Sequence, residues 1–339
     1  MTCGMPSVSV VVIGRNEEAH IGDCLRAVLA ATAELSAAEV VYVDSASTDR
    51  TVDIARSTGV RVVALRPEWK LSPSAGRYAG FHHTTGDLVM FVDGDTVIES
   101  DWLRRAIPYF DEPKVGGLTG VLDDVDEQGR ALPYVGRRCP AVSAVGQLRG
   151  SGLYRRAALE QAGPFNPYLD TEEEAELGLR LRQAGGELWQ VPHQMGCHRR
   201  GMRRHAEIWR DLRLGRCQSL GRTWRYACRA GLGWRFCRER LLPSLLFASM
   251  SLLLGAALLL WLARDARTGF LLWLLPVWLA AVVIRKRSLR GPLDYVATHV
   301  LIVYGLVVGA IGARLKDPQA YPRNVVEISP AARDVEPVL

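Results

Sequence analysis

The 339-residue chain lacks several features that would assign it to a familiar class. Its seven cysteines form no CxxC pair and no regular framework, which argues against a disulfide or zinc scaffold and indicates a reducing compartment. The apolar run 8–13 is too short for the h-region of a signal peptide. No G-x-G-x-x-G or G-x-x-x-x-G-K-[ST] pattern follows a predicted strand, so the usual dinucleotide-binding and P-loop sites find no support. A nucleotide bound here would need carboxylates and a metal at its phosphates.

Charge and apolar residues are distributed unevenly along the chain. The segment 199–240 holds 13 Arg against three acidic residues, and it carries most of the formal net charge of +6. Long uncharged runs follow Leu241. We therefore expect four parts, which are an α/β domain over 1–198, a basic amphipathic interfacial segment over 199–240, two to three membrane helices over 241–315, and a tail over 316–339.

Apolar strands alternate with helices in the first part. Strands are predicted at 7–13, 40–43, 60–65 and 88–92, with Asn16 as the N-cap of the first helix and a second helix opened by 47–49. This alternation predicts a mostly parallel sheet with flanking helices. Ligands on such sheets bind at the carboxyl ends of the strands. Asn16, Asp44 and Asp93 all fall at such ends.

The tripeptide Asp93-Gly94-Asp95 directly follows the last of these strands. Two carboxylates at positions i and i+2 can both turn toward one hard cation, with phosphate and water completing its coordination. Asp-Gly is also common turn chemistry, so a plain tight turn is the alternative.

Four segments in order resemble the motifs of family 2 glycosyltransferases: 10–18, 43–51, 91–95 and 173–181. The resemblance, to membrane-associated bacterial members, covers roughly 8–200. It implies a GT-A fold, which is a Rossmann-like α/β sheet with flanking helices. It also implies a metal-dependent, inverting hexosyltransferase that takes a UDP- or GDP-sugar and uses Mg²⁺ or Mn²⁺.

The resemblance assigns donor contacts to individual residues. Asn16 and Glu17 would contact the nucleoside, and Asp44 would accept hydrogen bonds from the base. Asp93 would lie near the ribose and diphosphate, with Asp95 as the direct metal ligand.

Further donor-side residues carry over with one departure from the family pattern. Arg77 would pair with the diphosphate, although Tyr78 stands where the family usually has Asn. His198 would be a further metal or diphosphate ligand, with an ordinary surface histidine as the alternative. The loop 150–152 resembles the family's small-residue loop beside the sugar.

The acidic segment after residue 170 supplies the candidate base. Glu174 would remove the proton from the acceptor hydroxyl, and Glu173 is the alternative. Thr171 and Glu174 also fit a capping box, so one of the two glutamates would cap the helix. Glu176 and Arg180, spaced i, i+4, are predicted to form a surface pair.

The basic and apolar segments predict a membrane partner. Arg and Trp interleaved over 199–240 suit an anionic leaflet, and the adjoining apolar runs argue against nucleic acid. Spans are predicted at 241–263, 270–284 and 296–313, the second of which is short enough to be re-entrant. The arginine distribution predicts an inner (cytoplasmic) membrane location with the catalytic domain facing the cytosol.

These features predict transfer of a sugar to a lipid-linked or membrane-proximal glycan acceptor. A processive polysaccharide synthase is one alternative, but its Gln-x-x-Arg-Trp motif is matched only at the wrong spacing, over 218–224. A catalytically idle membrane scaffold of the same fold is the other, and Tyr78 and Glu174 are the departures that motivate it.

Overall fold

The computed structural model describes five stretches of the chain, which are 5–126, 128–132, 139–199, 218–262 and 292–328. The chain divides into two compact units. The first comprises Met1–Arg203 together with Lys316–Leu339, and the second comprises Arg204–Leu315. Each is described by itself.

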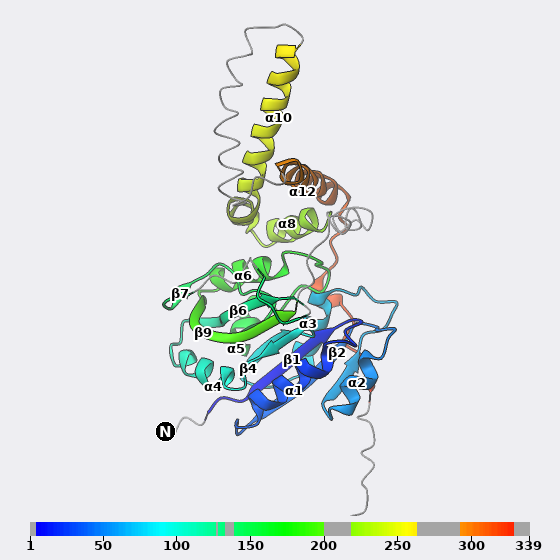
Figure 1. Cartoon of the computed structure of the whole chain (residues 1–339), viewed down its shortest axis with the longest axis vertical. Helices are drawn as coiled ribbons and strands as arrows, with labels where there is room; N and C mark the ends of the chain where they lie inside the picture. Colours follow the sequence, from blue (N-terminus) through cyan, green and yellow to red (C-terminus); the bar gives the residue numbers. More distant parts are fainter. Residues whose placement is uncertain (1–4, 127, 133–138, 200–217, 263–291, 329–339) are drawn as a thin grey trace, which may run out of the picture. The chain divides into compact units, whose positions relative to one another are not determined.

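The first unit is built around one large sheet (Figure 1). Its strand order is β10-β3-β2-β1-β4-β8-β6-β9-β5, with β7 paired to β9. The strands are β1 Val8–Gly14, β2 Ala38–Asp44, β3 Arg61–Ala64, β4 Leu88–Asp93, β5 Thr96–Ile98, β6 Val115–Val125, β7 Ser143–Ala144, β8 Gly152–Arg155, β9 Glu187–Arg199 and β10 Val326–Ile328.

The four strands predicted from the sequence form the parallel part of this sheet. β3, β2, β1 and β4 run parallel, and Ile13 of β1 lies in register with Val43 of β2 and Asp93 of β4. Beyond β4 the direction changes, because β8 pairs antiparallel with both β4 and β6. The sheet is therefore mixed, whereas the sequence predicted a mostly parallel one.

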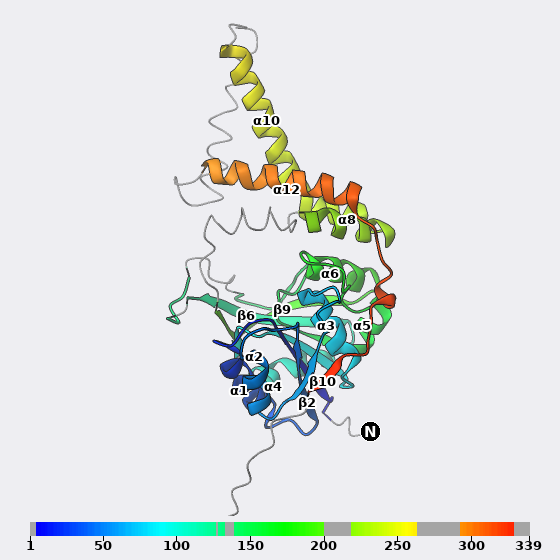
Figure 2. The same ribbon diagram turned by 90° about the vertical axis from the view of Figure 1, so that its right-hand side faces the viewer.

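Helices cover both faces of the sheet, as Figures 1 and 2 show. On one face α1, α2 and α4 pack against residues such as Val10, and on the other α3, α5 and α6 pack against residues such as Val11. Burial on both faces explains why β1 is an unbroken apolar run. The helices are α1 Ile21–Thr32, α2 Thr51–Ser57, α3 Pro73–His82, α4 Trp102–Ala106, α5 Arg156–Ala162 and α6 Glu173–Gln183, and the short 3₁₀ turns are η1 Ile107–Asp111 and η5 Pro318–Ala320.

Two helices begin later than the sequence predicted. α1 starts at Ile21 after His20, so Asn16 is not its N-cap. The side chain of Asn16 instead accepts a hydrogen bond from the Thr48 amide at 2.8 Å. α2 starts at Thr51, whose amide donates to the Asp49 carboxylate at 3.0 Å. In both places a polar side chain is used by a loop contact that sequence periodicity does not reveal.

The segment after residue 315, assigned from the sequence only to a tail, returns to the first unit. β10 pairs antiparallel with β3, with Glu327 opposite Val63. Tyr321 is buried at 2% exposure in the apolar layer that also contains Tyr78.

The second unit contains α8 Ser219–Arg229, α9 Gly233–Phe236, a π-helical turn η3 Cys237–Leu241, α10 Leu242–Leu262 and α12 Pro292–Gly312. α8 and α12 cross closely, because a Cβ on Gly221 would clash with the Leu306 carbonyl and one on Gly309 with the Gln218 carbonyl. Arg225 of α8 donates to the carbonyl oxygens of Ala310 and Ala313, at the end of α12.

The predicted membrane spans are only partly covered by these helices. Within the described part of the chain, no single helix is apolar over a length that crosses a bilayer, but the bent pair Gly233–Leu241 and Ser244–Ala257, at 56° to each other, meets that requirement by length and composition. The predicted run 296–313 coincides largely with α12. The predicted run 270–284 lies outside the described residues.

Candidate active site

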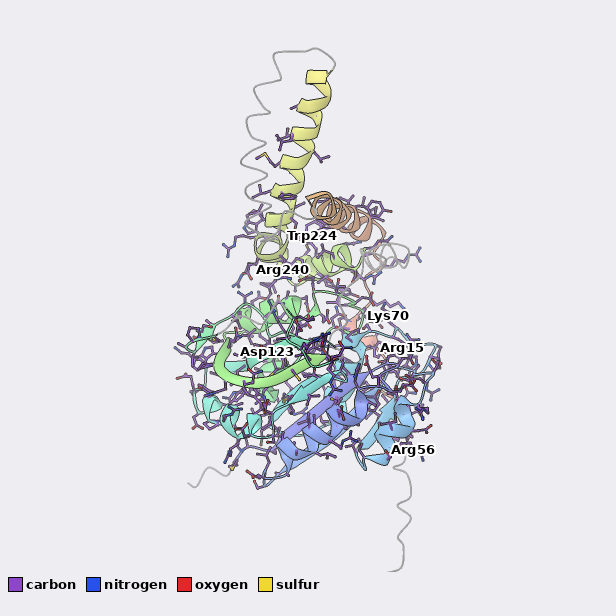
Figure 3. The ribbon with its side chains drawn as sticks, in the orientation of Figure 1. Arg15, Arg56, Lys70, Asp123, Trp224 and Arg240 are labelled. Carbon is purple, nitrogen blue, oxygen red and sulfur yellow. The ribbon has the colours of Figure 1, made fainter. Side chains whose placement is uncertain are left out.

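The candidate site lies at the carboxyl edge of the parallel strands. Figure 3 shows the side chains there and labels Arg15, which follows β1. Asp93 ends β4, and the Gly94 amide donates to the Ile13 carbonyl at 2.8 Å. A Cβ on Gly94 would lie only 3.1 Å from that carbonyl oxygen, so the small residue allows the Asp-Gly-Asp turn to lie against the end of β1.

Asp95 is held next to the end of β9. The Arg199 amide donates to the Asp95 carbonyl at 2.9 Å, and β5 continues this pairing with Thr96 opposite His198. The His198 ring then lies between two carboxylates, with Nε2 at 3.1 Å from Asp95 Oδ2 and Nδ1 at 3.0 Å from Asp124 Oδ1. We call Asp95, His198 and Asp124 the His198 cluster.

The His198 cluster favours a charged imidazole. Burial works against that charge, but the hydrogen bonds to Asp95 and Asp124 and the charges of Asp95 and Asp93 outweigh it and raise the pKa of His198 to about 9. Glu17 lies near the same carboxylates, and burial together with the charges of Asp95 and Asp93 raises its pKa to about 7. The site thus concentrates acidic groups around a single imidazole.

The residues present fit a divalent cation next to Asp95. The Oδ1 atom of Asp95 is buried and has no hydrogen-bond partner, which is costly unless another group satisfies it. Carboxylate oxygens and imidazole nitrogens are ligands that Mn²⁺ accepts, and carboxylates also suit Mg²⁺. Among the described residues, no group of three or more His, Cys, Asp or Glu side chains is arranged so that it could hold a metal ion by itself.

A second cluster surrounds Arg77 of α3, a residue that is only 2% exposed. Its guanidinium lies 2.8 Å from Asp93, 3.0 Å from Glu173 and 3.8 Å from Glu174, and it donates to the Gly150 carbonyl at 3.2 Å. We call Arg77, Asp93, Glu173 and Glu174 the Arg77 cluster. The expected diphosphate ligand is therefore already paired with carboxylates of its own chain.

Glu173 and Glu174 differ in their surroundings. The Glu173 side chain is 8% exposed and contacts Arg77, whereas the Glu174 side chain is 18% exposed and accepts from the Gly150 amide at 3.2 Å. Burial, with the adjacent Glu173 charge, raises the pKa of Glu174 to about 7. Of the two, Glu174 is the more accessible carboxylate.

Two expectations about α6 are wrong. Its N-cap is Glu172, in a left-handed conformation (φ 59°) without a side-chain cap, so Glu174 is not part of a capping box. The predicted box placed the N-cap at Thr171, but the N-cap lies one residue later, so Glu174 is not at the N3 position that the box requires. Glu176 and Arg180 do pair, at 2.8 Å, but the pair is buried because Arg180 also donates to the carbonyls that follow α5.

The loop 150–152, predicted to lie beside the sugar, approaches Asp93 closely. Gly150 has φ +36°, and a Cβ there would lie 2.7 Å from Asp93 Oδ2. A larger residue would therefore displace Asp93.

The residues expected at the nucleoside connect the loops that follow β1 and β2. The Asn16 amide donates to Ser47 Oγ at 2.9 Å, and Asp44 accepts from the Ser47 amide at 2.8 Å. Asp44 also accepts from Tyr42 at 3.1 Å and is buried. The structure thus brings Asn16, Glu17 and Asp44 to one edge of the sheet.

Asp124 was missed from the sequence, where no strand was assigned over 115–125. The segment reads Val121-Leu122-Asp123-Asp124, so carboxylates follow apolar residues much as they do at Asp93. That shared pattern is the signal that points to Asp124.

Comparisons with known proteins agree with this geometry. Residues 9–166 match the sequence profile of glycosyl transferase family 2. Beta-monoglucosyldiacylglycerol synthase from Synechocystis sp. is 26% identical over 257 residues, which cover 69% of this chain and 53% of the synthase. The chain thus spans about half the length of that relative.

Two further proteins extend the comparison. Glycosyltransferase AglE from Haloferax volcanii is 28% identical over 208 residues, covering 58% of this chain and 68% of AglE. The structure of mannosyltransferase PcManGT from Pyrobaculum calidifontis, in complex with GDP-Man and Mn²⁺, shares the fold, with a TM-score of 0.62 at 17% identity over 91% of this chain and 88% of that one. The profile match shows that residues 9–166 form a domain of the glycosyl transferase family 2 type, and the relatives and the shared fold are consistent with it.

Proposed function

We propose that the chain transfers a sugar, with inversion, from a UDP- or GDP-sugar to a lipid-linked or other membrane-proximal acceptor. The observation that carries this proposal is the presence of two distinct carboxylate clusters at one sheet edge. One contains a buried, unpartnered Asp95 oxygen, and the other contains the accessible carboxylate of Glu174.

The His198 cluster provides the donor side. Asp95, His198 and Asp93 are the residues that would hold Mg²⁺ or Mn²⁺, with Asp124 orienting His198 through its Nδ1 atom. When bound, the cation would stabilise negative charge on the departing diphosphate as a Lewis acid. That PcManGT was solved with Mn²⁺ supports this choice of cation.

The nucleoside would lie over the loops after β1 and β2, where Asn16, Glu17 and Asp44 meet. Hydrogen bonds that join Asn16 and Asp44 to residues 47–48 fix the backbone of both loops before any ligand binds. Such preorganisation lowers the ordering cost of binding.

Glu174 provides the general base. As the acceptor oxygen attacks the anomeric carbon, Glu174 takes the hydroxyl proton while the bond to the diphosphate breaks, and one displacement inverts the anomeric centre. A pKa near 7 lets this carboxylate accept a proton efficiently at neutral pH. Arg77 keeps Asp93 and Glu173 in place beneath it.

The acceptor class is inferred from the second unit and from one relative. The apolar helices α10 and α12, and arginines such as Arg222 and Arg229 on α8, suit the surface of an anionic membrane. The name of the Synechocystis relative describes a glucosyldiacylglycerol, which is a membrane lipid. We therefore propose an inner-membrane enzyme whose first unit faces the cytosol.

A donor screen tests the proposal. Membranes containing the full chain should release UDP or GDP from one nucleotide-sugar in the presence of Mn²⁺, and chelation should stop the release. Titration calorimetry should show Mn²⁺-dependent binding of the same nucleoside diphosphate. Absence of binding to both UDP and GDP would contradict the proposal and favour the idle scaffold.

A further inference from the structure

Residues 316–328 follow the second unit in the sequence but belong to the first unit, and we call this segment the strap (Figure 2). Its last residues form β10 on the edge of the sheet. Its middle contains Tyr321, which is almost completely buried. Neither the proposed chemistry nor the sequence motifs use this segment.

Tyr321 packs among three aromatic side chains from different parts of the first unit. Its ring lies edge-on to Trp69 at 5.8 Å, to Tyr78 at 5.7 Å and to Tyr168 at 5.7 Å, measured between ring centroids. Its hydroxyl donates to the Lys70 carbonyl at 2.7 Å, and Figure 3 labels Lys70. A single strap residue therefore contacts both the segment before α3 and the segment before α6.

Those two segments lead directly to the Arg77 cluster. The segment 69–72 enters α3, which carries Arg77, and the segment 167–170 precedes Glu173 and Glu174 at the start of α6. They are also joined directly, since Ser72 Oγ donates to the Pro167 carbonyl at 3.0 Å. Lys70 and Asp170 add an ion pair between them. Tyr321 packs against both segments within the apolar layer that contains Tyr78.

The strap also explains Tyr78, which departs from the family pattern. Tyr78 is 2% exposed, and the Arg323 guanidinium donates to its hydroxyl at 3.3 Å and lies 5.9 Å from its ring centre. An Asn at this position would lack the ring against which Tyr321 and Arg323 pack. Tyr78, which motivated the alternative of an idle scaffold, is therefore a residue against which the strap packs.

We propose that Tyr321 is a positioning residue for Glu174. Tyr321 acts by fixing the segments before α3 and α6 relative to each other, so that Glu174 stays aligned with the acceptor hydroxyl. This inference rests on the proposed function, because it assigns Glu174 as the base.

The experiment uses the full chain in membranes or detergent and compares Tyr321→Ala, Tyr321→Phe and the control Glu327→Gln. Glu327 lies on the same strap but pairs with Arg61 at the sheet edge. The first readout is amide hydrogen exchange at 66–72 and 166–172. The second separates kcat for nucleotide release from the Kd of UDP or GDP with Mn²⁺.

We expect Tyr321→Ala to speed amide exchange in both segments, because it removes the contacts that join them. It should also lower kcat at least about tenfold, because even a small displacement of a catalytic group lowers the rate strongly. The Kd should stay within about twofold, since the donor residues are held by other contacts. Tyr321→Phe, which loses only the hydrogen bond to Lys70, should fall between wild type and Tyr321→Ala. Glu327→Gln should match wild type.

Unchanged exchange in Tyr321→Ala, or raised exchange with unchanged kcat, would overturn the inference. If that variant does not fold, Tyr321→Phe decides, and behaviour equal to Glu327→Gln overturns it. A wild type without donor turnover contradicts the proposed function instead. The exchange measurement then decides alone whether the strap holds the two segments.

Discussion

The His198 and Arg77 clusters are both groups of carboxylates around one cation, but the two cations differ in kind. Arg77 is buried at 2% side-chain exposure and keeps its charge at every pH of interest, whereas His198 is 20% exposed and can lose its proton. A neutral imidazole can bind a metal, and a guanidinium cannot. The comparison therefore indicates that Arg77 is a permanent structural support for the carboxylates around it, whereas the proton on His198 can be exchanged for a metal ion.

The largest effect should come from removing one reactive carboxylate from each cluster. Glu174→Gln and Asp95→Asn should each lower transfer by about 10²–10⁴-fold. Only Asp95→Asn should also abolish Mn²⁺-dependent binding of UDP or GDP, because Glu174 belongs to the acceptor side. Glu160→Gln and Asp53→Asn, at exposed sites, are matched controls. Loss of nucleotide binding in Glu174→Gln would break the separation between the clusters.

Removing the positively charged side chains of Arg77 and His198 should have unequal effects on the free energy of unfolding. Arg77→Gln leaves Glu173 buried without a partner and should cost about 3–5 kcal/mol. His198→Gln should cost about 1 kcal/mol or less, because Asp95 and Asp124 are each 25% exposed and remain partly hydrated. Thermal unfolding of the purified chain measures both. Equal losses of unfolding free energy would show that His198 has a structural role like that of Arg77.

Asp124→Asn tests whether orientation of His198 matters. The neutral amide oxygen accepts the Nδ1 proton more weakly than the charged carboxylate does and makes His198 a weaker ligand, so Mn²⁺ affinity should fall about 10–100-fold. Asp123→Asn is the control, since the neighbouring carboxylate accepts from Gln194 instead. Mn²⁺ binding measured by electron paramagnetic resonance gives the affinity without an activity assay. An unchanged affinity would remove Asp124 from the donor side.

The smallest effect concerns the pH response of Glu174. Because its folded pKa of about 7 lies above its ordinary 4.5, kcat should rise with pH through about 7 as the base loses its proton. Because this pKa is raised in the folded state, the protonated Glu174 side chain stabilises the fold at low pH, and that stabilisation is lost as the pH rises through about 7. Glu174→Gln should therefore raise Tm at pH 8 by about 2–4 °C, with little change at pH 4.5. A kcat that is flat from pH 5 to 8 would contradict this assignment.

Local patterns were sufficient to predict the parallel part of the fold. β1, β2, β3 and β4 were each predicted within about two residues, because strands buried on both faces contain near-continuous apolar runs. Gly59, with φ +81°, directly follows the C-cap of α2, where glycine is common. The order of carboxylates along these strands was enough to predict one shared edge.

The contacts that failed prediction join residues far apart in the chain. Arg77 and Glu173 are 96 positions apart and Asp124 and His198 are 74 apart, so no window of sequence contains both partners. The capping box at Thr171 and Glu174 was a sound local pattern, but Arg77 and Gly150 attract the glutamates more strongly. The strap was missed for the same reason, since Tyr321 and Lys70 are 251 positions apart.

Pairing of β10 with β3 has a practical consequence for handling the protein. Without β10, the backbone donors and acceptors along the outer side of β3 would be open to a strand from another molecule. β10 itself is three residues long and carries the charged Glu327, which are features that discourage further strand addition. A chain shortened after α12 for expression should therefore tend to form insoluble aggregates, even though every residue of the two carboxylate clusters is retained.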